Sequence, residues 1–258
     1  MVASIFADRS GASRAQRLYF YNKQTNITAD LSTEATLQPG EWGAIQLPLG
    51  PNLIQDPGFE RAFAATSEGG WRINAHTNGA VASIDSKSPR SGQHALMLAQ
   101  STPVTFSPEA LRSSDYGAFI KSANGGAGGG HVEVEQGVPV TGGHQYSFRI
   151  NYRSQELRQE TRQPAPSRGY SRLNVTIAWT NGTNALGSVH VLDERRNFAD
   201  WNQLTNWMAN YWSVNKPYRA PQDSTRAVLT LSLDTLTPDD LPTIYIDDLE
   251  LVEDNFTV

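Results

Sequence analysis

The sequence contains no cysteine, few basic residues and no long apolar run, and each absence excludes a class of protein. Without cysteine the chain can form neither a disulfide nor a thiolate metal site, and its compartment stays open. It has 21 basic and 26 acidic residues, and this net charge of −5 argues against the basic stripe that binds nucleic acid. No run of about 18 apolar residues occurs, so no membrane-spanning helix is predicted. The start of the chain, Met1–Ala7, also lacks the basic segment and long apolar core of a signal peptide.

Turn-forming residues are abundant, with 21 glycines and 14 prolines between short segments in which apolar and polar residues alternate. The predicted strands of the main part of the chain are Trp71–Asn74, Ala80–Ile84, His94–Leu98, His131–Gln136, Gln145–Arg153, Arg172–Thr180, Ser188–Leu192, Trp212–Tyr218, Arg226–Asp234 and Ile244–Val252. A short helix is predicted at Phe198–Trp207, and no longer helix is indicated. We therefore predict an all-β protein, whose 38% of hydrophobic residues suffices for the core of a sandwich of this length.

The first 50 residues are predicted to be a short β appendage. Residues 1–16 are polar, so little regular structure is expected there. Arg17–Asn22, Asn26–Leu31 and Leu37–Leu49 are predicted strands, and three strands are marginally stable alone. The Gly50-Pro51 pair divides residues 1–50 from a main domain at 51–258. The appendage is either the end of a preceding domain or packed on the sandwich.

Two short stretches far apart in the sequence carry acidic residues next to apolar ones. Asn52–Glu60 is a short strand followed by a Pro-Gly turn, and Tyr245–Leu251 alternates in a way that places Asp247 on the same face as two leucines. An acidic residue in register with apolar neighbours is costly unless it has a partner. Glu60 and Asp247 could therefore share one cation. The alternative is that both face solvent or pair with a basic residue such as Lys87.

Five segments occur in a characteristic order: NLIQDPGFE, SPRSGQHALML, EQGVPVTGGHQYSFRINYRS, YRAPQDSTRAVLTLSL and YIDDLEL. Together, over Asn52–Glu253, they resemble the carbohydrate-binding modules of families 4, 9, 16 and 22. The resemblance implies a jelly-roll β-sandwich with a galactose-binding-like fold. It also implies that the protein is secreted, binds a polysaccharide or oligosaccharide, and carries a linked catalytic domain.

The resemblance further implies a structural Ca²⁺ that ties the first strand of the domain to the last. Its ligands on this sequence would be the Glu60 side chain, the Gly58 carbonyl, a carbonyl near Gln93, and Asp247. Asp248 would replace Asp247 if the register shifts by one residue. Calcium takes six to eight oxygen ligands of this kind.

Sugar recognition needs aromatic faces for stacking and planar polar groups for hydroxyls. Tyr146, Phe148, Ile150 and Tyr152 are predicted to face the core, which leaves Arg149 and Asn151 on the other face of their strand. Asn174 and Thr176 are expected to join these two, while Trp179 and Trp212 are expected in the core. The predicted stacking residues lie in or beside loops: Trp71, Tyr116, Tyr170, Trp201 and Trp207.

An enzymatic function is the least favoured reading. Glu133 and Glu135 lie about 7 Å apart on one strand face, a separation at which carboxylate pairs can hydrolyse glycosides. A surface acidic pair explains them better. No nucleophile elbow or zinc-type histidine spacing occurs. We therefore predict a non-catalytic carbohydrate-binding module. The alternatives are a structural spacer or interaction domain of a multidomain secreted protein, and a jelly-roll glycosidase or lyase.

Overall fold

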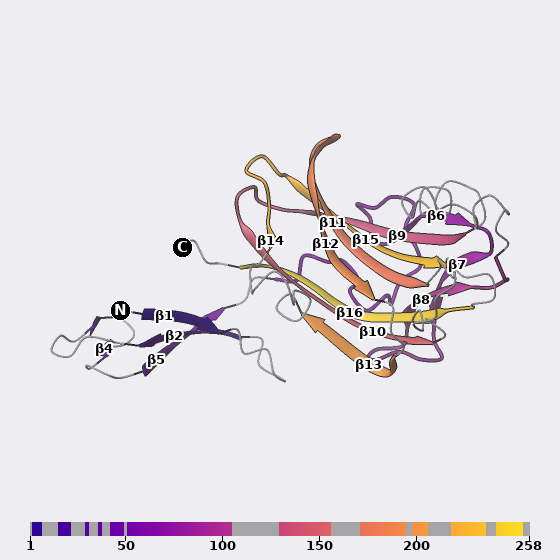
Figure 1. Cartoon of the computed structure of the whole chain (residues 1–258). Coiled ribbons are helices and arrows are strands. Elements are labelled where there is room, and N and C mark those ends of the chain that lie inside the picture. Colours follow the sequence, from indigo (N-terminus) through magenta and orange to yellow (C-terminus); the bar gives the residue numbers. More distant parts are fainter. Residues whose placement is uncertain are drawn as a thin grey trace, which may run out of the picture. The chain divides into compact units, whose positions relative to one another are not determined.

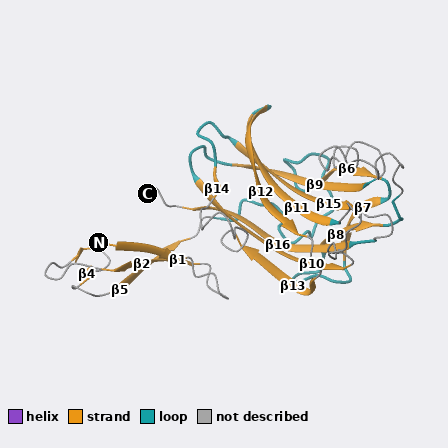
Figure 2. Cartoon of the chain, in the orientation of Figure 1, coloured by secondary structure: helices purple, strands orange, loops and turns teal. Residues whose placement is uncertain are grey.

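The computed structural model describes residues 51–104, 129–155, 171–194, 198–205, 218–235 and 241–254, together with the backbone of five strands before residue 51. Every regular element in these parts of the chain is a β-strand, which confirms the all-β prediction (Figure 2). They contain no helix that is long and apolar enough to cross a membrane. The chain divides into two compact units: Met1–Pro51 with Glu253–Asn255, and Asn52–Val252 with Phe256–Val258.

The first unit contains two small antiparallel sheets. One has the order β1-β2-β5, made of Val2–Phe6, Ala15–Tyr21 and Trp42–Pro48, and the other pairs β3 (Ala29–Asp30) with β4 (Thr36–Leu37). The expectation of irregular structure before residue 16 is wrong, because β1 pairs with β2 along its whole length. Within the strand predicted at Asn26–Leu31, the described strand is Ala29–Asp30, which pairs with β4.

The second unit consists of two antiparallel sheets that lie one over the other (Figure 1). The six-stranded sheet has the order β13-β10-β16-β8-β7, with β14 paired to β10. Its strands are β13 (Phe198–Thr205), β10 (Gln145–Gln155), β16 (Thr243–Asp254), β8 (Ala95–Gln100), β7 (Ala80–Asp85) and β14 (Tyr218–Arg219). The five-stranded sheet has the order β12-β11-β15-β9-β6. Its strands are β12 (Asn184–Glu194), β11 (Arg172–Asn181), β15 (Arg226–Thr235), β9 (Gly130–Pro139) and β6 (Arg72–Thr77). These neighbours come from distant parts of the sequence, which gives the predicted jelly-roll sandwich.

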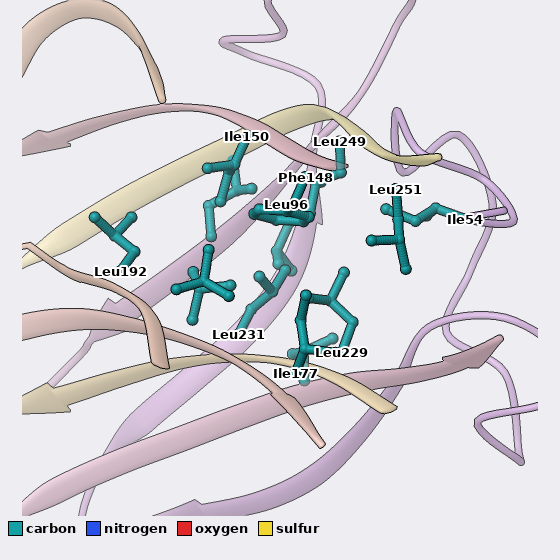
Figure 3. Packing of buried hydrophobic residues seen from close by; sticks show 14 of the residues in the cluster. Ile54, Leu96, Phe148, Ile150, Ile177, Leu192, Leu229, Leu231, Leu249 and Leu251 are labelled. Atoms are coloured by element: carbon teal, nitrogen blue, oxygen red, sulfur yellow. The ribbon is translucent and has the colours of Figure 1, made fainter. Parts of the chain in front are cut away.

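The core lies between the two sheets and is built by the alternation of each strand. Figure 3 shows Phe148 and Ile150 of one sheet facing Ile177, Leu229 and Leu231 of the other. The four apolar residues predicted for β10 are all at most 1% exposed, and Trp179 is 2% exposed, so these core predictions are confirmed. The opposite side chains of each strand therefore form the two outer faces of the sandwich.

The helix predicted at Phe198–Trp207 is wrong. Phe198–Thr205 is an edge strand, β13, paired antiparallel with β10. The extended backbone lets Phe198 pack edge-on against Tyr152, with ring centroids 5.6 Å apart, while Asn202 donates a 2.8 Å hydrogen bond to the same tyrosine hydroxyl. Tertiary packing thus decides the structure of this segment.

The regular alternation predicted for Tyr245–Leu251 is also wrong. Ile246 and Leu249 both lie in the core, three positions apart, so one extra residue is inserted between them. Asp248 has a φ of 48°, in the left-handed region, as expected where a strand bulges. The bulge separates Asp247 from the apolar side chains with which the sequence had aligned it.

Candidate functional site

Ring packing and hydrogen bonds fix the turn from Asp56 to Glu60. Phe59 is fully buried, and its ring lies 5.0 Å from that of Trp71, whose indole donates a 3.1 Å hydrogen bond to the Asp56 carbonyl. The Asp56 carboxylate accepts the backbone N–H groups of Glu60 and Arg61 at 2.8 and 3.0 Å. Asp56 and Phe59 have φ values of 53° and 55°. Strained backbone of this kind persists only where the surroundings enforce it, and it clusters at functional sites.

This turn is joined directly to the last strand of the domain. Asn52 forms a bridge with Val252, and the Leu53 N–H donates to the Leu251 carbonyl at 2.8 Å. The Leu249 N–H donates to the Pro57 carbonyl at 3.0 Å. The beginning and end of the domain therefore meet next to the bulge at Asp248.

Asp247 is a buried carboxylate whose partners in the described parts of the chain are all backbone N–H groups. It accepts from Arg90 at 2.8 Å, from Ser91 at 3.1 Å and from Asp248 at 2.8 Å. No cationic side chain pairs with it in the described residues, since the Arg90 guanidinium binds Asp248 instead. Burial raises the pKa of Asp247 above its ordinary value, despite the N–H donors. A buried carboxylate with these surroundings lacks a positive partner.

The Glu60 carboxylate lies near Asp247, and we call the surroundings of these two carboxylates the Asp247 pocket. Its Oε1 accepts the Gln93 N–H at 2.9 Å, and its Oε2 lies 3.0 Å from Nδ1 of His94. The Gln93 N–H and then the His94 ring hold the pKa of Glu60 below its ordinary value. Gly92 allows this approach, because a Cβ there would lie 1.8 Å from Oε1 of Glu60.

The four residues predicted to bind a metal lie close together. Oxygens of Asp247 and Glu60 lie 3.5 and 3.8 Å from the position that a Cβ on Gly58 would occupy, and Gln93 contacts Glu60. Gln93 contacts Glu60 through its backbone N–H, whereas the prediction used a carbonyl near Gln93 as a ligand. No cluster of three or more His, Cys, Asp or Glu side chains suited to a metal occurs among the described residues. A cation here would therefore depend on backbone carbonyls in addition to the two carboxylates.

A second polar cluster, which we call the sheet-face network, lies on the outer face of the five-stranded sheet. Its centre is Asp234, which is 3% exposed. Asp234 lies 2.7 Å from Nδ1 of His131, and accepts hydrogen bonds from Nε of Arg172 at 3.0 Å and from Asn174 at 2.5 Å. Glu133 extends the network, with Nε2 of His131 3.7 Å away and an Asn74 hydrogen bond at 2.5 Å.

The charges in the sheet-face network stabilise each other. The carboxylates of Asp234 and Glu133 raise the pKa of His131 to about 9. The hydrogen bond to His131 lowers the pKa of Glu133. Burial opposes ionisation of Asp234, but the His131 and Arg172 contacts outweigh it and lower its pKa. At neutral pH the cluster is therefore an imidazolium and a guanidinium between two carboxylates.

Most of this network was not predicted from the sequence. Alternation placed Glu133 and Glu135 on one face, which the structure shares, but Glu135 pairs with Arg72 at 2.6 Å. The missing information was strand order, since β15 brings Asp234 beside His131 of β9. The alternation of Arg226–Asp234 already placed Ser232 and Asp234 opposite the leucines, and this signal was available.

The predicted sugar contacts do not assemble as expected. Arg149 and Asn151 lie on the outer face of the six-stranded sheet, and Asn174 and Thr176 on that of the other sheet, so the expectation that they meet is wrong. Arg149 pairs with Glu250 at 3.0 Å. Asn151 is 1% exposed and donates to the Asp248 carbonyl, which withdraws it from any ligand.

The predicted stacking residues have different environments. Trp71 is 3% exposed and packs on Phe59, so its prediction as a stacking residue is wrong. Trp201 is half-buried, with the Arg153 guanidinium 5.6 Å from its ring centroid. The remaining predicted aromatic residues lie outside the described parts of the chain, and these are Tyr116, Tyr170, Trp207 and the core candidate Trp212.

No protein-family model and no curated protein matches this chain. Several solved structures are similar to it. TmCBM61 in complex with beta-1,4-galactotriose is 13% identical, with a TM-score of 0.41 over 79% of this chain and 99% of that one. The CBM22-1 xylan-binding domain from Paenibacillus barcinonensis Xyn10C is 12% identical, with a TM-score of 0.41 over 82% and 99% of the two chains. The enzymatically active domain of bacteriophage CBA120 tailspike protein 4 is 10% identical, with a TM-score of 0.43 over 79% of this chain but 21% of that one.

The similar structures include carbohydrate-binding modules of families 4, 22 and 61, of which the first two are named by the sequence resemblance. Their TM-scores lie below 0.5. At this level the likenesses assign neither a ligand nor an activity to the chain.

Proposed function

We propose that residues 52–252 form a non-catalytic module that binds a polysaccharide and directs a linked glycoside-active enzyme to it in a secreted protein. The observation that carries the proposal is the sheet-face network. It places acceptors and donors of hydrogen bonds side by side on one outer face, as sugar hydroxyls require. Each group is held in position by its neighbours before a ligand arrives, which lowers the entropy lost on binding.

A sugar would reach the exposed side chains of the sheet-face network and of Arg72, which lies beside it on β6. The side chains of Arg72 and Glu133 are 36% and 24% exposed, while that of Asp234 is 4% exposed. Asp234 therefore acts as an anchor that orients His131 and Arg172. Glu133 and Arg72, at the side of the network next to β6, supply an acceptor and a planar donor for hydroxyl groups.

The ionisation of the carboxylates supports binding without hydrolysis. A glycosidase needs one carboxyl group with a raised pKa, which can donate a proton to the leaving oxygen. The pKa of Glu133 is lowered by its contacts with His131 and Asn74. Glu135, its partner on the strand, is ion-paired with Arg72. The lowered pKa of Glu133 favours its ionised form, which does not suit the carboxylic acid that a glycosidase needs.

A structural Ca²⁺ at the Asp247 pocket is part of the proposal. The oxygen ligands would be the carboxylates of Asp247 and Glu60 and the Gly58 carbonyl, completed by further carbonyls. The support is that Asp247 is buried, has a raised pKa and, among the described residues, accepts hydrogen bonds only from N–H groups. A cation would compensate this charge and join the first and last segments of the domain, without taking part in chemistry.

The decisive experiment is a titration of the purified chain with soluble xylan, β-1,4-galactan and mixed-linkage β-glucan by calorimetry, with an assay for released reducing ends. We expect saturable binding to one class and no release. Glu133→Gln should weaken binding about tenfold or more, as for a lost charge-assisted hydrogen bond. Asp200→Asn is the matched control, since it removes one charge from an exposed position on the other sheet.

The second candidate function is a structural spacer or interaction domain. It is favoured by the composition of the outer face of the five-stranded sheet, whose described strands carry no outward-facing aromatic residue. A folded protein that binds no glycan of the panel would establish the spacer. Release of reducing ends that Glu133→Gln abolishes would instead establish a glycosidase.

A further inference from the structure

The outer face of the six-stranded sheet carries an arginine between two aromatic rings. The Arg153 guanidinium lies 4.4 Å from the ring centroid of Tyr245 and 5.6 Å from that of Trp201. The three residues come from adjacent strands, β16, β10 and β13. Their neighbours Tyr152, Ile244 and Ile246 lie in the core, so Arg153 and Tyr245 point away from it. We call these three residues the arginine stack.

Arg153 differs from every comparable arginine in the described part of the chain. Four other arginines there are half-buried, and each has a carboxylate oxygen within 3.0 Å. The pairs are Arg72–Glu135, Arg149–Glu250, Arg172–Asp234 and Arg226–Glu68. Among the described residues Arg153 has no such partner, and its buried Nε makes no hydrogen bond there, as is also the case for Nε of Arg149 and Arg226. The fold thus supplies a counter-charge to each of these arginines except the one in the stack.

We propose that the arginine stack is a second ligand site, which binds the carboxylate of an acidic sugar. A guanidinium keeps its charge at every physiological pH and binds a carboxylate with two parallel hydrogen bonds. The two rings offset part of the charge through cation–π attraction and hold the guanidinium plane. An anion would compensate the rest, which a half-buried cation without a partner leaves unsatisfied.

The surroundings of the stack favour a sugar over other anionic ligands. In register with Tyr245 and its neighbour Thr243 lie Met97, Ala99 and Val81, and Val81 is 39% exposed. These apolar groups continue the same outer face from Tyr245 across β8 to β7, and the C–H face of a pyranose whose carboxylate binds Arg153 can pack toward them over the Tyr245 ring. A nucleic acid would require several cations in a row, whereas the stack provides one.

This site lies on the opposite sheet from the sheet-face network, so it goes beyond the proposed function. The two can be tested separately. If the chain binds no neutral glycan, the sheet-face network is refuted as a sugar site, and the proposal for the arginine stack is unaffected.

The experiment measures binding of short oligogalacturonates, and of the same oligosaccharides as neutral methyl esters, by calorimetry and tryptophan fluorescence. We expect binding of the acid form and at least tenfold weaker binding of the ester. Arg153→Gln should weaken binding of the acid at least tenfold. Arg153→Lys should recover only part of it, because an ammonium group lacks the planar fork.

Arg219→Gln is the matched control, since it removes one positive charge from an exposed position on the same sheet and should leave the affinity unchanged. Thermal melting confirms that each variant folds. Three outcomes would overturn the proposal: no binding of the acid form, equal loss in Arg153→Gln and Arg219→Gln, or equally tight binding of polyglutamate. The last would show that the site takes any carboxylate, as an acidic peptide would offer.

Discussion

Two aspartates of this domain are both buried, and yet their pKa values are shifted in opposite directions. Asp234 is 3% exposed and Asp247 fully buried, so both have lost most of their hydration. His131 and Arg172 surround Asp234, and its pKa is lowered. Among the described residues, Asp247 has only backbone N–H groups as partners, and burial raises its pKa. Burial opposes ionisation in both cases, and a nearby cation decides whether this is overcome. Asp234 thus has counter-charges within the chain, whereas Asp247 has none among the described residues.

The strongest test replaces each aspartate by asparagine in the presence of chelator. Asp234→Asn removes the buried carboxylate that Arg172 and His131 share and leaves them only the more distant Asp193 and Glu133, each 3.7 Å away, so the free energy of unfolding should fall by about 3 kcal/mol. Asp247→Asn removes a charge that has no cationic partner among the described residues but places an NH₂ group against a backbone N–H, so stability should fall by only about 1 kcal/mol. Urea unfolding monitored by tryptophan fluorescence measures both variants. Equal destabilisation by the two substitutions would contradict the distinction between them.

Calcium should stabilise the folded chain by supplying the missing counter-charge at Asp247. At a hundredfold excess over its dissociation constant, a ligand that binds only the folded state adds about 2.7 kcal/mol. For a domain of this size, that raises the melting temperature by about 5–10 °C. The rise should be absent in Asp247→Asn and retained in Asp234→Asn. Magnesium at the same concentration is the control, since it prefers a smaller octahedral site. An identical response of Asp247→Asn and the unchanged chain would remove calcium from this pocket.

The sheet-face network predicts a loss of stability in weak alkali. The pKa of His131 is raised from 6.5 to about 9, so its contribution is complete below pH 6.5 and disappears as the pH rises through 9. With solvent screening of a partly exposed group, the loss should be about 2 kcal/mol. The midpoint of urea unfolding between pH 6 and 9 measures it. His131→Gln should be less stable at pH 6 and should lack this decline, and a decline of the same size in the variant would assign it to other groups.

The sequence predicted the fold better than the sites because alternation is local and strand order is not. The core residues of β10 and β11 follow from a two-residue period, and the structure has them in the core. The helix predicted at Phe198 failed because its packing partner, Tyr152, lies on another strand. The bulge at Asp248 had no local signal beyond two adjacent acids.

The two candidate sites also differ in how far the sequence predicted them. The residues around Asp247 were predicted from ordered motifs at both ends of the domain, and the structure places Gly58, Glu60 and Gln93 near this pocket. The sheet-face network needed the pairing of β9 with β15, which no motif announces. Trp71 was misassigned because its place beside a loop indicated exposure, whereas the turn at Phe59 covers it.

The finest distinction concerns two glycines at the Asp247 pocket. Gly92 has a φ of 62°, and a Cβ there would collide with Oε1 of Glu60 at 1.8 Å, whereas a Cβ on Gly58 would make ordinary contacts of 3.5 Å or more. The glutamate can swing away, so Gly92→Ala loses the contact with the Gln93 N–H and strains the turn. We expect a loss of about 1–2 kcal/mol and a smaller calcium response.

Gly58→Ala is the matched substitution and should leave stability within about 0.5 kcal/mol, since it adds neither strain nor a collision. Unfolding of both variants with and without calcium gives the comparison. If Glu60 belongs to the cation site, only Gly92→Ala will weaken the response, because only that change displaces the glutamate. If both variants respond to calcium like the unchanged chain, Glu60 is held by Gln93 and His94 for structure alone, and Asp247 binds the cation with backbone carbonyls.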